Sequence, residues 1–498
     1  MTTISSQSSL DSKIYSICNI MRRGNLSGAL EYIPELTWLL FLRILDEQEE
    51  LEAAENQAVG RTFSPSVSSP YRWQDWASPK GKKRQELQNG MSGDAFKFAN
   101  DELIPYLKEL RNQSSATSRQ KVISAILSGV QRVRIDTERN FLEVLDRVDD
   151  IRQEAIDPTH IFPLSQAYEG LLLRMGEKNN DGGQFFTPRE LIRAVVEVVA
   201  PKVGETIFDP GCGTGGFLAQ SYNYIQKQLG NTATADQMSQ LSEKTFYGKE
   251  KADQIYPIAL ANLVLHGINA PNIWHGNTLT SNPTYDGLFQ GAPQLFDVIL
   301  MNPPFGGSEG QEAQTRYAYK TGSTQVLFMQ EVIDSLKSGG RAGIVVDEGL
   351  LFRTNETAFV QTKRKLLDEC DLYCIVSLPG GVFTQAGAGV KTNLLFFNKG
   401  NHTEKIWYYD LSDLKIAKRK PLTIGHFKEF LELLPSRGDS ENSWTVTREE
   451  IEAKNYDLKA VNPNRKEEVD TRTPDDLLDI IEQKGKEIED ALAMLRSL

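Results

Sequence analysis

The residues best suited to chemistry follow an apolar run near the middle of the chain. The run F-D-V-I-L-M at 296–301 leads directly into Asn302, Pro303, Pro304 and Phe305. Two consecutive prolines fix φ and supply no N–H, so this segment presents carbonyl oxygens and the Asn302 side chain. Oxygen acceptors from Asn302 and Pro303 can hold both hydrogens of a planar exocyclic amine and stabilise positive charge growing on its nitrogen. Phe305 can stack on the ring of a flipped base. A rigid loop leaving a strand is the alternative.

A glycine-rich loop comes earlier in the same part of the chain, in the run T-I-F-D-P-G-C-G-T-G-G-F at 206–217. Gly211, Gly213 and Gly216 fit the spacing G-x-G-x-x-G and precede a helical pattern, so a dinucleotide site is one alternative. Asp209 argues against that alternative, because a carboxylate at the strand end would repel a pyrophosphate.

A second acid, Glu250, follows the next apolar run in F-Y-G-K-E. A carboxylate in this place can accept hydrogen bonds from both hydroxyls of a ribose. The two acids therefore favour a ligand that has a ribose, lacks a pyrophosphate and carries a cationic end near Asp209. S-adenosyl-L-methionine has this chemistry.

The elements that position these residues form an α/β pattern between about 184 and 400. Seven short apolar runs alternate with helical patterns, which is typical of a parallel sheet. They lie at 206–208, 245–247, 273–274, 297–301, 342–346, 373–378 and 393–397. The last two are joined by a glycine-rich connection without a helix, so we expect them to pair antiparallel. Asn302 and the glycine loop then lie at the carboxyl edge of the sheet, where such folds bind ligands. The polar segment 306–325 reads as a surface loop, or as a flap that orders on DNA, or as both.

The flanking segments read as helical. Residues 11 to about 150 show three- and four-residue apolar spacing, which predicts a helical bundle. The polar stretch 64–93 inside it predicts a long loop or insertion. At the other end, Thr473 is a good N-cap for a helix with an apolar stripe of 3.5-residue period. A helix packed on its own domain and a helix offered to a partner both fit this stripe.

Composition limits the function. The 498 residues carry 67 acidic and 55 basic side chains, a formal net charge of −12, which argues against a chain that binds nucleic acid tightly alone. Basic clusters at 80–84, 363–365 and 415–420 read mainly as solvated faces that can also touch phosphates. Four scattered cysteines and five histidines show no ligand spacing, so we expect no metal and no disulfide scaffold. No signal peptide or membrane span is evident, and we expect a cytoplasmic chain.

The motifs resemble those of a known family. Asp209 to Phe217 and Asn302 to Phe305 resemble motifs I and IV of amino-group DNA methyltransferases, and G-Q-F-F-T-P at 183–188 resembles motif X. The order X, I, IV matches the γ class of adenine-N6 enzymes. The resemblance implies that Asn302, Pro303, Pro304 and Phe305 are catalytic, and that the cofactor is bound by Gln184, Phe185, Thr187, Asp209, Gly211, Gly213, Thr214, Gly216, Glu250 and Asn277.

The resemblance also implies which end of the cofactor some of these residues bind. Phe185 and Thr187 are expected to hold the methionine end of the cofactor. Asn277 stands where the family often has an acid that binds the amino group of the cofactor's adenine. Its side-chain carbonyl can still accept a hydrogen bond from that amine, but it carries no charge.

The flanks resemble the modification subunit of type I restriction–modification systems, in K-I-Y-S-I-C-N-I-M-R-R-G-N-L-S, Y-I-P-E-L-T-W-L-L-F-L-R-I-L-D-E and N-Y-D-L-K-A-V-N-P-N. This resemblance implies methylation of adenine N6 in double-stranded DNA, with sequence specificity from a separate subunit, two modification chains per specificity subunit, and a restriction subunit in the full complex. The −12 charge then predicts dependence on a partner.

The expected fold is a seven-stranded Rossmann-like methyltransferase sheet with an N-terminal helical bundle and a C-terminal helix. Its expected divisions are a helical domain at 1–155, the methyltransferase domain at 156–400, an extension at 401–470 and a partner-binding helix at 471–498.

Three other functions remain open from the residues alone. An enzyme that methylates a protein glutamine or ribosomal RNA can use the same Asn-Pro-Pro chemistry, but it needs neither the helical domain nor the terminal helix. A nicotinamide enzyme would bind NADH and not S-adenosylmethionine. A non-catalytic scaffold would be unaffected by loss of the Asn302 side chain.

Overall fold

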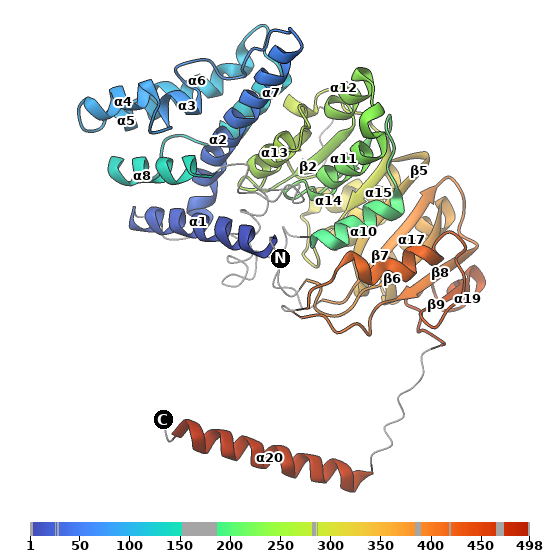
Figure 1. Cartoon of the computed structure of the whole chain (residues 1–498). Helices are drawn as coiled ribbons and strands as arrows, with labels where there is room; N and C mark the ends of the chain where they lie inside the picture. Colours follow the sequence, from blue (N-terminus) through green and yellow to red (C-terminus); the bar gives the residue numbers. More distant parts are fainter. Residues whose placement is uncertain are drawn as a thin grey trace.

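The structure is a computed structural model that describes residues 3–24, 26, 29–151, 187–280, 285, 287–383, 390–417, 420–464 and 473–496. A group of N-terminal helices packs beside an α/β unit, and a last helix stands apart from both (Figure 1).

The N-terminal part is helical, as its periodicity predicts. Its helices are α1 (Thr3–Arg23), α2 (Ala29–Ala58), α3 (Trp73–Trp76), α4 (Lys82–Asn89), α5 (Asp94–Lys97), α6 (Ile104–Glu109), α7 (Ser118–Leu127) and α8 (Glu138–Asp149), with a π-helical turn at Phe98–Leu103. The stripe of α8, with Phe141 and Val144 at its centre, is fully buried. The bundle shares one hydrophobic core with one face of the sheet.

The stretch 64–93 is predicted to be a long loop or insertion, and the long loop is wrong, because α3 and α4 lie within it. Trp73 and Trp76 are each only 2% exposed, and the Trp76 ring packs against Phe98 and Phe141. Two buried indoles anchor a segment that is otherwise polar, so its average composition conceals its role in the core.

Two of the basic clusters are likewise not plain solvated faces. Arg84 is 1% exposed; it donates to the Ala77 carbonyl and pairs with Asp146 at 2.8 Å. Lys363 is 2% exposed and donates to the carbonyls of Leu351 and Arg353. Both cations are committed to the fold and are not free to bind phosphate.

The α/β unit holds one sheet of nine strands in the order β3-β2-β1-β4-β5-β7-β6-β8-β9. The strands are β1 (Ile207–Asp209), β2 (Phe246–Glu250), β3 (Asn272–His275), β4 (Phe296–Met301), β5 (Leu336–Asp347), β6 (Cys370–Ser377), β7 (Thr392–Lys399), β8 (Lys405–Asp410) and β9 (Ser443–Thr447). All seven predicted strands are present, and β6 and β7 pair antiparallel as expected.

The sheet is larger than the seven strands expected, because residues after 400 continue it. β8 pairs parallel with β6, and β9 pairs antiparallel with β8. The expected extension at 401–470 is therefore partly built into the same sheet.

Helices cover both faces of the sheet. On one face lie α10 (Arg189–Val199), α11 (Gly216–Leu229), α12 (Ala235–Glu243), α13 (Tyr256–Leu265) and α18 (Lys428–Leu433), and on the other α15 (Thr324–Ser335), α16 (Glu348–Phe352), α17 (Thr357–Glu369) and α19 (Arg448–Ala453). The order of β1, β2 and β4 brings Asp209, Glu250 and Asn302 to one carboxyl edge.

Helix α13 connects the two parts of the molecule. Its residues from Ile258 to Val264 are all buried, and a helix that is apolar all round must be covered on every side. The sheet covers one side of α13, and α2 and α7 cover another.

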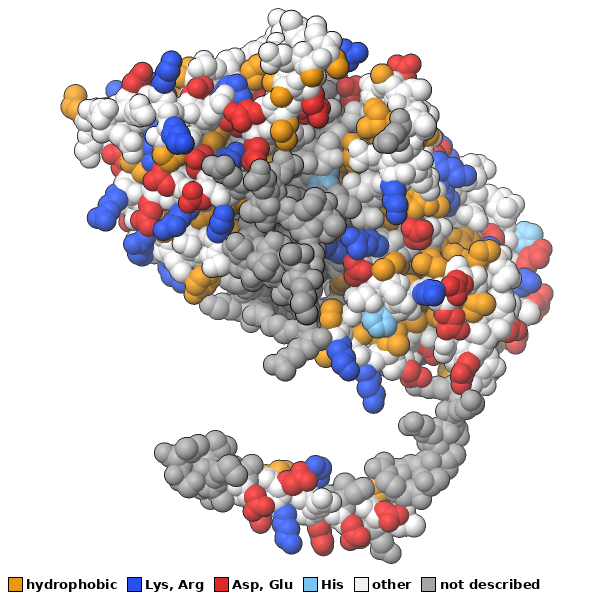
Figure 2. Space-filling view, viewed as in Figure 1, with side chains coloured by type: hydrophobic (Ala, Val, Ile, Leu, Met, Phe, Trp, Pro, Cys, Tyr) orange, Lys and Arg blue, Asp and Glu red, His pale blue; other side chains and the backbone are white. Residues whose placement is uncertain are grey.

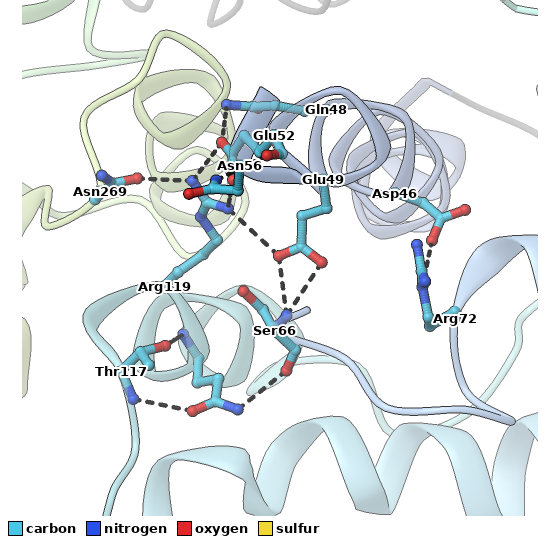
Figure 3. A network of polar contacts seen from close by, with 11 residues as sticks. Asp46, Gln48, Glu49, Glu52, Asn56, Ser66, Arg72, Thr117, Arg119 and Asn269 are labelled. Atoms are coloured by element: carbon cyan, nitrogen blue, oxygen red, sulfur yellow. Dashed lines mark hydrogen bonds and ion pairs between the residues drawn. The ribbon is translucent and has the colours of Figure 1, made fainter. Parts of the chain in front are cut away.

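A partly buried arginine fixes this contact (Figure 3). The Arg119 guanidinium, on α7, donates to both oxygens of Glu52 at 2.9 Å and to Glu49 at 3.4 Å, both on α2. It also donates to the Asn269 side chain, just beyond α13, at 2.9 Å. Arg119 therefore joins two N-terminal helices to the α/β unit.

The last helix, α20 (Pro474–Arg496), stands away from the body of the molecule in Figure 1. Thr473 caps it, accepting from the Asp476 backbone N–H at 3.2 Å. Its stripe is exposed, with Leu477 at 37%, Ile481 at 66% and Ile488 at 60%. Among the described residues, no helix is long and apolar enough to cross a membrane.

We predict that Arg119→Ala lowers the free energy of unfolding by about 2–4 kcal/mol, because it leaves the buried Glu49 carboxylate without its cation. Urea unfolding followed by tryptophan fluorescence measures the loss. Arg23→Ala is the matched control: its pair with Glu143 is exposed, at 60% and 36%, and is worth under about 1 kcal/mol. Equal losses for the two variants would contradict the role given to Arg119.

Candidate active site

The glycine loop between β1 and α11 has the backbone that only glycine adopts easily. Gly213 and Gly215 have φ of +53° and +80°. At Gly211, a Cβ atom would lie 2.9 Å from the Met301 side chain, directly before Asn302. The loop is thus pressed against the end of β4, and a larger side chain at 211 would separate them.

A buried residue that the sequence motif does not include also holds this loop. Asn262, on α13, is 2% exposed and donates from its side-chain amide to the Thr214 carbonyl at 2.8 Å. Nothing in the local sequence marks Asn262, apart from its being the single polar residue in an apolar helix.

The two acids singled out from the sequence lie at the ends of adjacent strands, and both are buried. Asp209 is 2% exposed and accepts from the Gly211 N–H at 3.1 Å. Glu250 is 7% exposed and accepts from the N–H groups of Gly213 at 2.9 Å and Ala252 at 2.7 Å. No described lysine or arginine forms an ion pair with either acid.

Burial therefore governs their protonation. It raises the pKa of Asp209 to about 8, with a further increase from the negative charge of Glu250, although the Gly211 N–H opposes both. Burial also raises the pKa of Glu250, against its backbone hydrogen bonds. A cation placed beside this pair would favour the ionised carboxylates.

Asn302 lies directly after β4, and its side chain is held by Thr187. Its amide Nδ2 donates to the Thr187 hydroxyl at 2.9 Å, across 115 positions of sequence. Its Oδ1 is buried and accepts no hydrogen bond. An acceptor left in this state costs about 1–3 kcal/mol, so the fold keeps an oxygen ready for an incoming donor. Gln184 and Phe185, expected beside Thr187, lie outside the described residues.

Phe305 is half-buried and packs edge-to-face against Phe383, with ring centroids 5.1 Å apart. Phe383 is 1% exposed and lies in the connection after β6. Phe383 could not be selected from local sequence, because a phenylalanine in a glycine-rich connection has no periodicity to mark it.

The segment 306–325 has defined local structure. It contains an isolated bridge between Ser308 and Ser323 and a short helix, α14 (Gln311–Arg316). Arg316 anchors it, donating to the Thr278 carbonyl at 2.5 Å and pairing with the buried Glu331 at 3.2 Å.

Asn277 follows β3 at the same edge, half-buried. Its Oδ1 accepts from the Leu279 N–H at 3.0 Å, and its Nδ2 donates to Glu309 at 3.1 Å. The structure therefore brings Asp209, the glycines, Thr214, Glu250, Asn277, Thr187 and the segment from Asn302 to Phe305 to one edge of the sheet.

Comparison with known proteins agrees with this geometry. The sequence model of the N-6 DNA Methylase family matches residues 160–472, and that of the HsdM N-terminal domain matches residues 10–129.

Related proteins cover almost the whole chain. The methylase subunit of the type I restriction enzyme EcoEI from Escherichia coli is 32% identical, over 98% of this chain and 97% of its own. The methylase subunit of the type I restriction enzyme EcoKI from Escherichia coli K12 is 29% identical, over 89% of this chain and 80% of its own.

Solved structures extend the likeness to the fold. A modification subunit of a putative type I restriction enzyme from Vibrio vulnificus is 31% identical, with a TM-score of 0.79 over 93% of this chain and 98% of its own. A chain from a study of complex assembly and conformational transition in the type I restriction–modification system is 36% identical, with a TM-score of 0.70 over 98% and 97%.

The fold, the site and these matches define a class: the chain belongs to the N-6 DNA methylase family. Within that class it is the methylase subunit of a type I restriction–modification system, an adenine-specific N6 DNA methyltransferase that forms part of a type I complex.

The raised pKa of Asp209 predicts a pH dependence of stability. With a pKa of about 8 when folded and 3.8 ordinarily, the folded chain keeps a proton that the unfolded chain releases, so stability falls as pH rises between these values. Between pH 6 and pH 8 we expect the free energy of unfolding of wild type to fall by about 2 kcal/mol relative to that of Asp209→Asn, which cannot ionise at this position.

Urea unfolding at both pH values measures this difference. Asp297→Asn is the control: Asp297 pairs with Lys337 at 2.7 Å and its pKa is lowered by that hydrogen bond, against burial. The change in the free energy of unfolding caused by Asp297→Asn should be the same at pH 6 and pH 8. A pH-independent effect of Asp209→Asn would show that Asp209 is ionised throughout.

Proposed function

We propose that this subunit uses S-adenosyl-L-methionine as methyl donor and binds it at the carboxyl edge of β1 and β2. The observation that carries this proposal is the buried pair Asp209 and Glu250, which has no cation of its own among the described residues. The cofactor has a cationic methionine end and a ribose with two hydroxyls, and it lacks the phosphates that such a pair would repel.

The residues present fit this cofactor. Gly211 and Gly216 let the loop pack closely on Met301 and Ile192, and Gly213 supplies a positive φ, so the loop backbone can lie close to a ligand. Glu250 would accept the ribose hydroxyls, and Asp209 with Thr187, and with Gln184 and Phe185 outside the described part, would bind the methionine end. Thr214 completes the loop, and Asn277 bounds the adenine end. Once bound, the cofactor supplies an electrophilic methyl group.

We propose that Asn302 and Pro303 then act on the target adenine. The Asn302 amide donates to Thr187, which leaves Oδ1 free to accept from the exocyclic amine, and the Pro303 carbonyl takes its second hydrogen. Both acceptors stabilise positive charge on that nitrogen as the new bond forms. Pro304 fixes the segment, and Phe305, braced by Phe383, stacks on the base flipped out of double-stranded DNA.

The partners follow from charge and from α20. On the face shown in Figure 2, acidic and basic side chains alternate over the N-terminal helices rather than forming a basic stripe. With a net charge of −12, the chain needs a partner to hold DNA. We propose a specificity subunit as that partner, with two copies of this chain per specificity subunit, and a restriction subunit in the full complex. Such an assembly works in the cytoplasm, where its DNA lies.

The same proposal retains the divisions 1–155, 156–400, 401–470 and 471–498, with 156–400 and 401–470 acting together because β8 and β9 complete one sheet. The last of these, which contains α20, is the partner-binding helix, because Ile481 and Ile488 are exposed and α20 stands apart from the body of the molecule in Figure 1.

Transfer of a labelled methyl group to duplex DNA, with the specificity subunit co-purified, tests the activity of the site. We predict that Phe305→Ala slows transfer about tenfold or more, because base stacking on an aromatic ring is worth roughly 1–3 kcal/mol. Binding of S-adenosylmethionine, measured by calorimetry, should stay near wild type.

Phe96→Ala is the matched control, since Phe96 is also partly buried against one ring, that of Phe141, but lies in the N-terminal domain. It should leave transfer nearly unchanged. Loss of cofactor binding in Phe305→Ala would contradict the role in base stacking, and no transfer by any sample that contains the partner would overturn the proposal.

The role of α20 is tested in the full chain. We predict that the double change Ile481→Glu and Ile488→Glu weakens association with the specificity subunit at least tenfold, because it places two carboxylates in the apolar stripe. Glu482→Gln with Glu489→Gln has the same seven-residue spacing on α20 outside that stripe and should bind as wild type. Analytical ultracentrifugation of the mixed subunits measures both, and equal affinities would exclude this stripe as the interface.

A further inference from the structure

The segment that follows the catalytic motif crosses the ligand edge of the sheet. In the order β3-β2-β1-β4, Asn302 leaves β4 and Asn277 leaves β3, with the ends of β1 and β2 between them. Glu309, only seven residues after Asn302, nevertheless accepts from the Asn277 amide at 3.1 Å. The chain therefore passes from the catalytic side of the edge to its far side.

Glu309 is held firmly in that position. Its N–H donates to the Gly322 carbonyl at 2.9 Å, and its own carbonyl accepts from the Gln314 side chain at 2.7 Å. The Thr324 hydroxyl lies 3.4 Å from its Oε1. No described lysine or arginine pairs with its carboxylate, so the remaining lone pairs are available to a neutral donor.

Asn277, by contrast, is already occupied. Its Oδ1 accepts from the Leu279 N–H and its Nδ2 donates to Glu309. These bonds run in one direction, from a backbone N–H through the amide to the carboxylate. Asn277 therefore orients Glu309, and the carboxylate is the acceptor at the end of the chain of bonds.

We propose that Glu309 is the specificity-determining residue for the purine of the cofactor, accepting a hydrogen bond from its exocyclic amino group, with Asn277 as a positioning residue. This inference rests on the proposed cofactor site. A carboxylate acceptor selects a purine that has a donor at this position and disfavours one that has a carbonyl oxygen there.

This assignment also links the binding of the cofactor to that of the target adenine. Glu309 lies four residues after Phe305, in the segment 306–325 that Arg316 fixes to the loop after β3. A purine bound by Glu309 would therefore hold the start of this segment, and with it Phe305, which is proposed to stack on the target base.

The test compares two ligands, S-adenosylhomocysteine and its deaminated analogue S-inosylhomocysteine, by calorimetry on the full chain. Wild type should prefer the adenosyl ligand at least about tenfold, as expected for a charge-assisted hydrogen bond. In Glu309→Gln that preference should fall about tenfold, because the neutral amide accepts more weakly and can donate to the inosyl carbonyl.

Glu312→Gln makes the same chemical change three residues away, at an exposed position in α14, and should keep the wild-type preference. Retained binding of the inosyl ligand by Glu309→Gln shows that the variant is folded. An unchanged preference in Glu309→Gln, with loss of preference in Asn277→Ala, would overturn the inference and assign the contact to Asn277. If wild type bound neither ligand, the cofactor proposal itself would fail.

Discussion

The site depends on two carboxylates buried at the ends of neighbouring strands, neither of which forms an ion pair with a lysine or arginine that the structure describes. Asp209 and Glu250 receive backbone N–H groups of the loop and turn that follow β1 and β2, and these few hydrogen bonds only partly offset the cost of burial. The glycines that follow make this arrangement possible, because positive φ at Gly213 and Gly215 directs the loop back over the strand ends. Within the described part of the chain no lysine or arginine pairs with either acid, so a cationic ligand would favour their ionised forms.

Contacts from distant parts of the sequence hold that loop in place. Asn262, on α13, donates to the Thr214 carbonyl of the loop. Just beyond α13, Asn269 accepts from Arg119 of the N-terminal helices. Thr187 reaches Asn302 from the segment before the first strand. The helical domain, the glycine loop and the segment that begins at Asn302 are therefore linked by a series of partly buried contacts.

Local patterns predicted much of this architecture. The seven apolar runs are strands, and the motifs lie at their carboxyl ends, because strand periodicity and turn residues are properties of short segments. Features that depend on distant partners were missed. Trp73 and Trp76 are hidden in a polar stretch, β8 and β9 join the sheet only through β6, and Asn262, Phe383 and Glu309 acquire their roles from neighbours more than 30 positions away.

The two added strands matter for how the chain can be divided. If the chain ended at residue 400, β6 would become the outer strand, and its unpaired N–H and C=O groups would stand beside the apolar side chains of Leu372, Ile375 and Val376. Such an edge recruits strands from other molecules and leads to aggregation. β9, with only five residues, S-W-T-V-T, is a short outer strand that offers little to a second chain. A fragment that keeps the catalytic sheet soluble therefore has to run through Thr447.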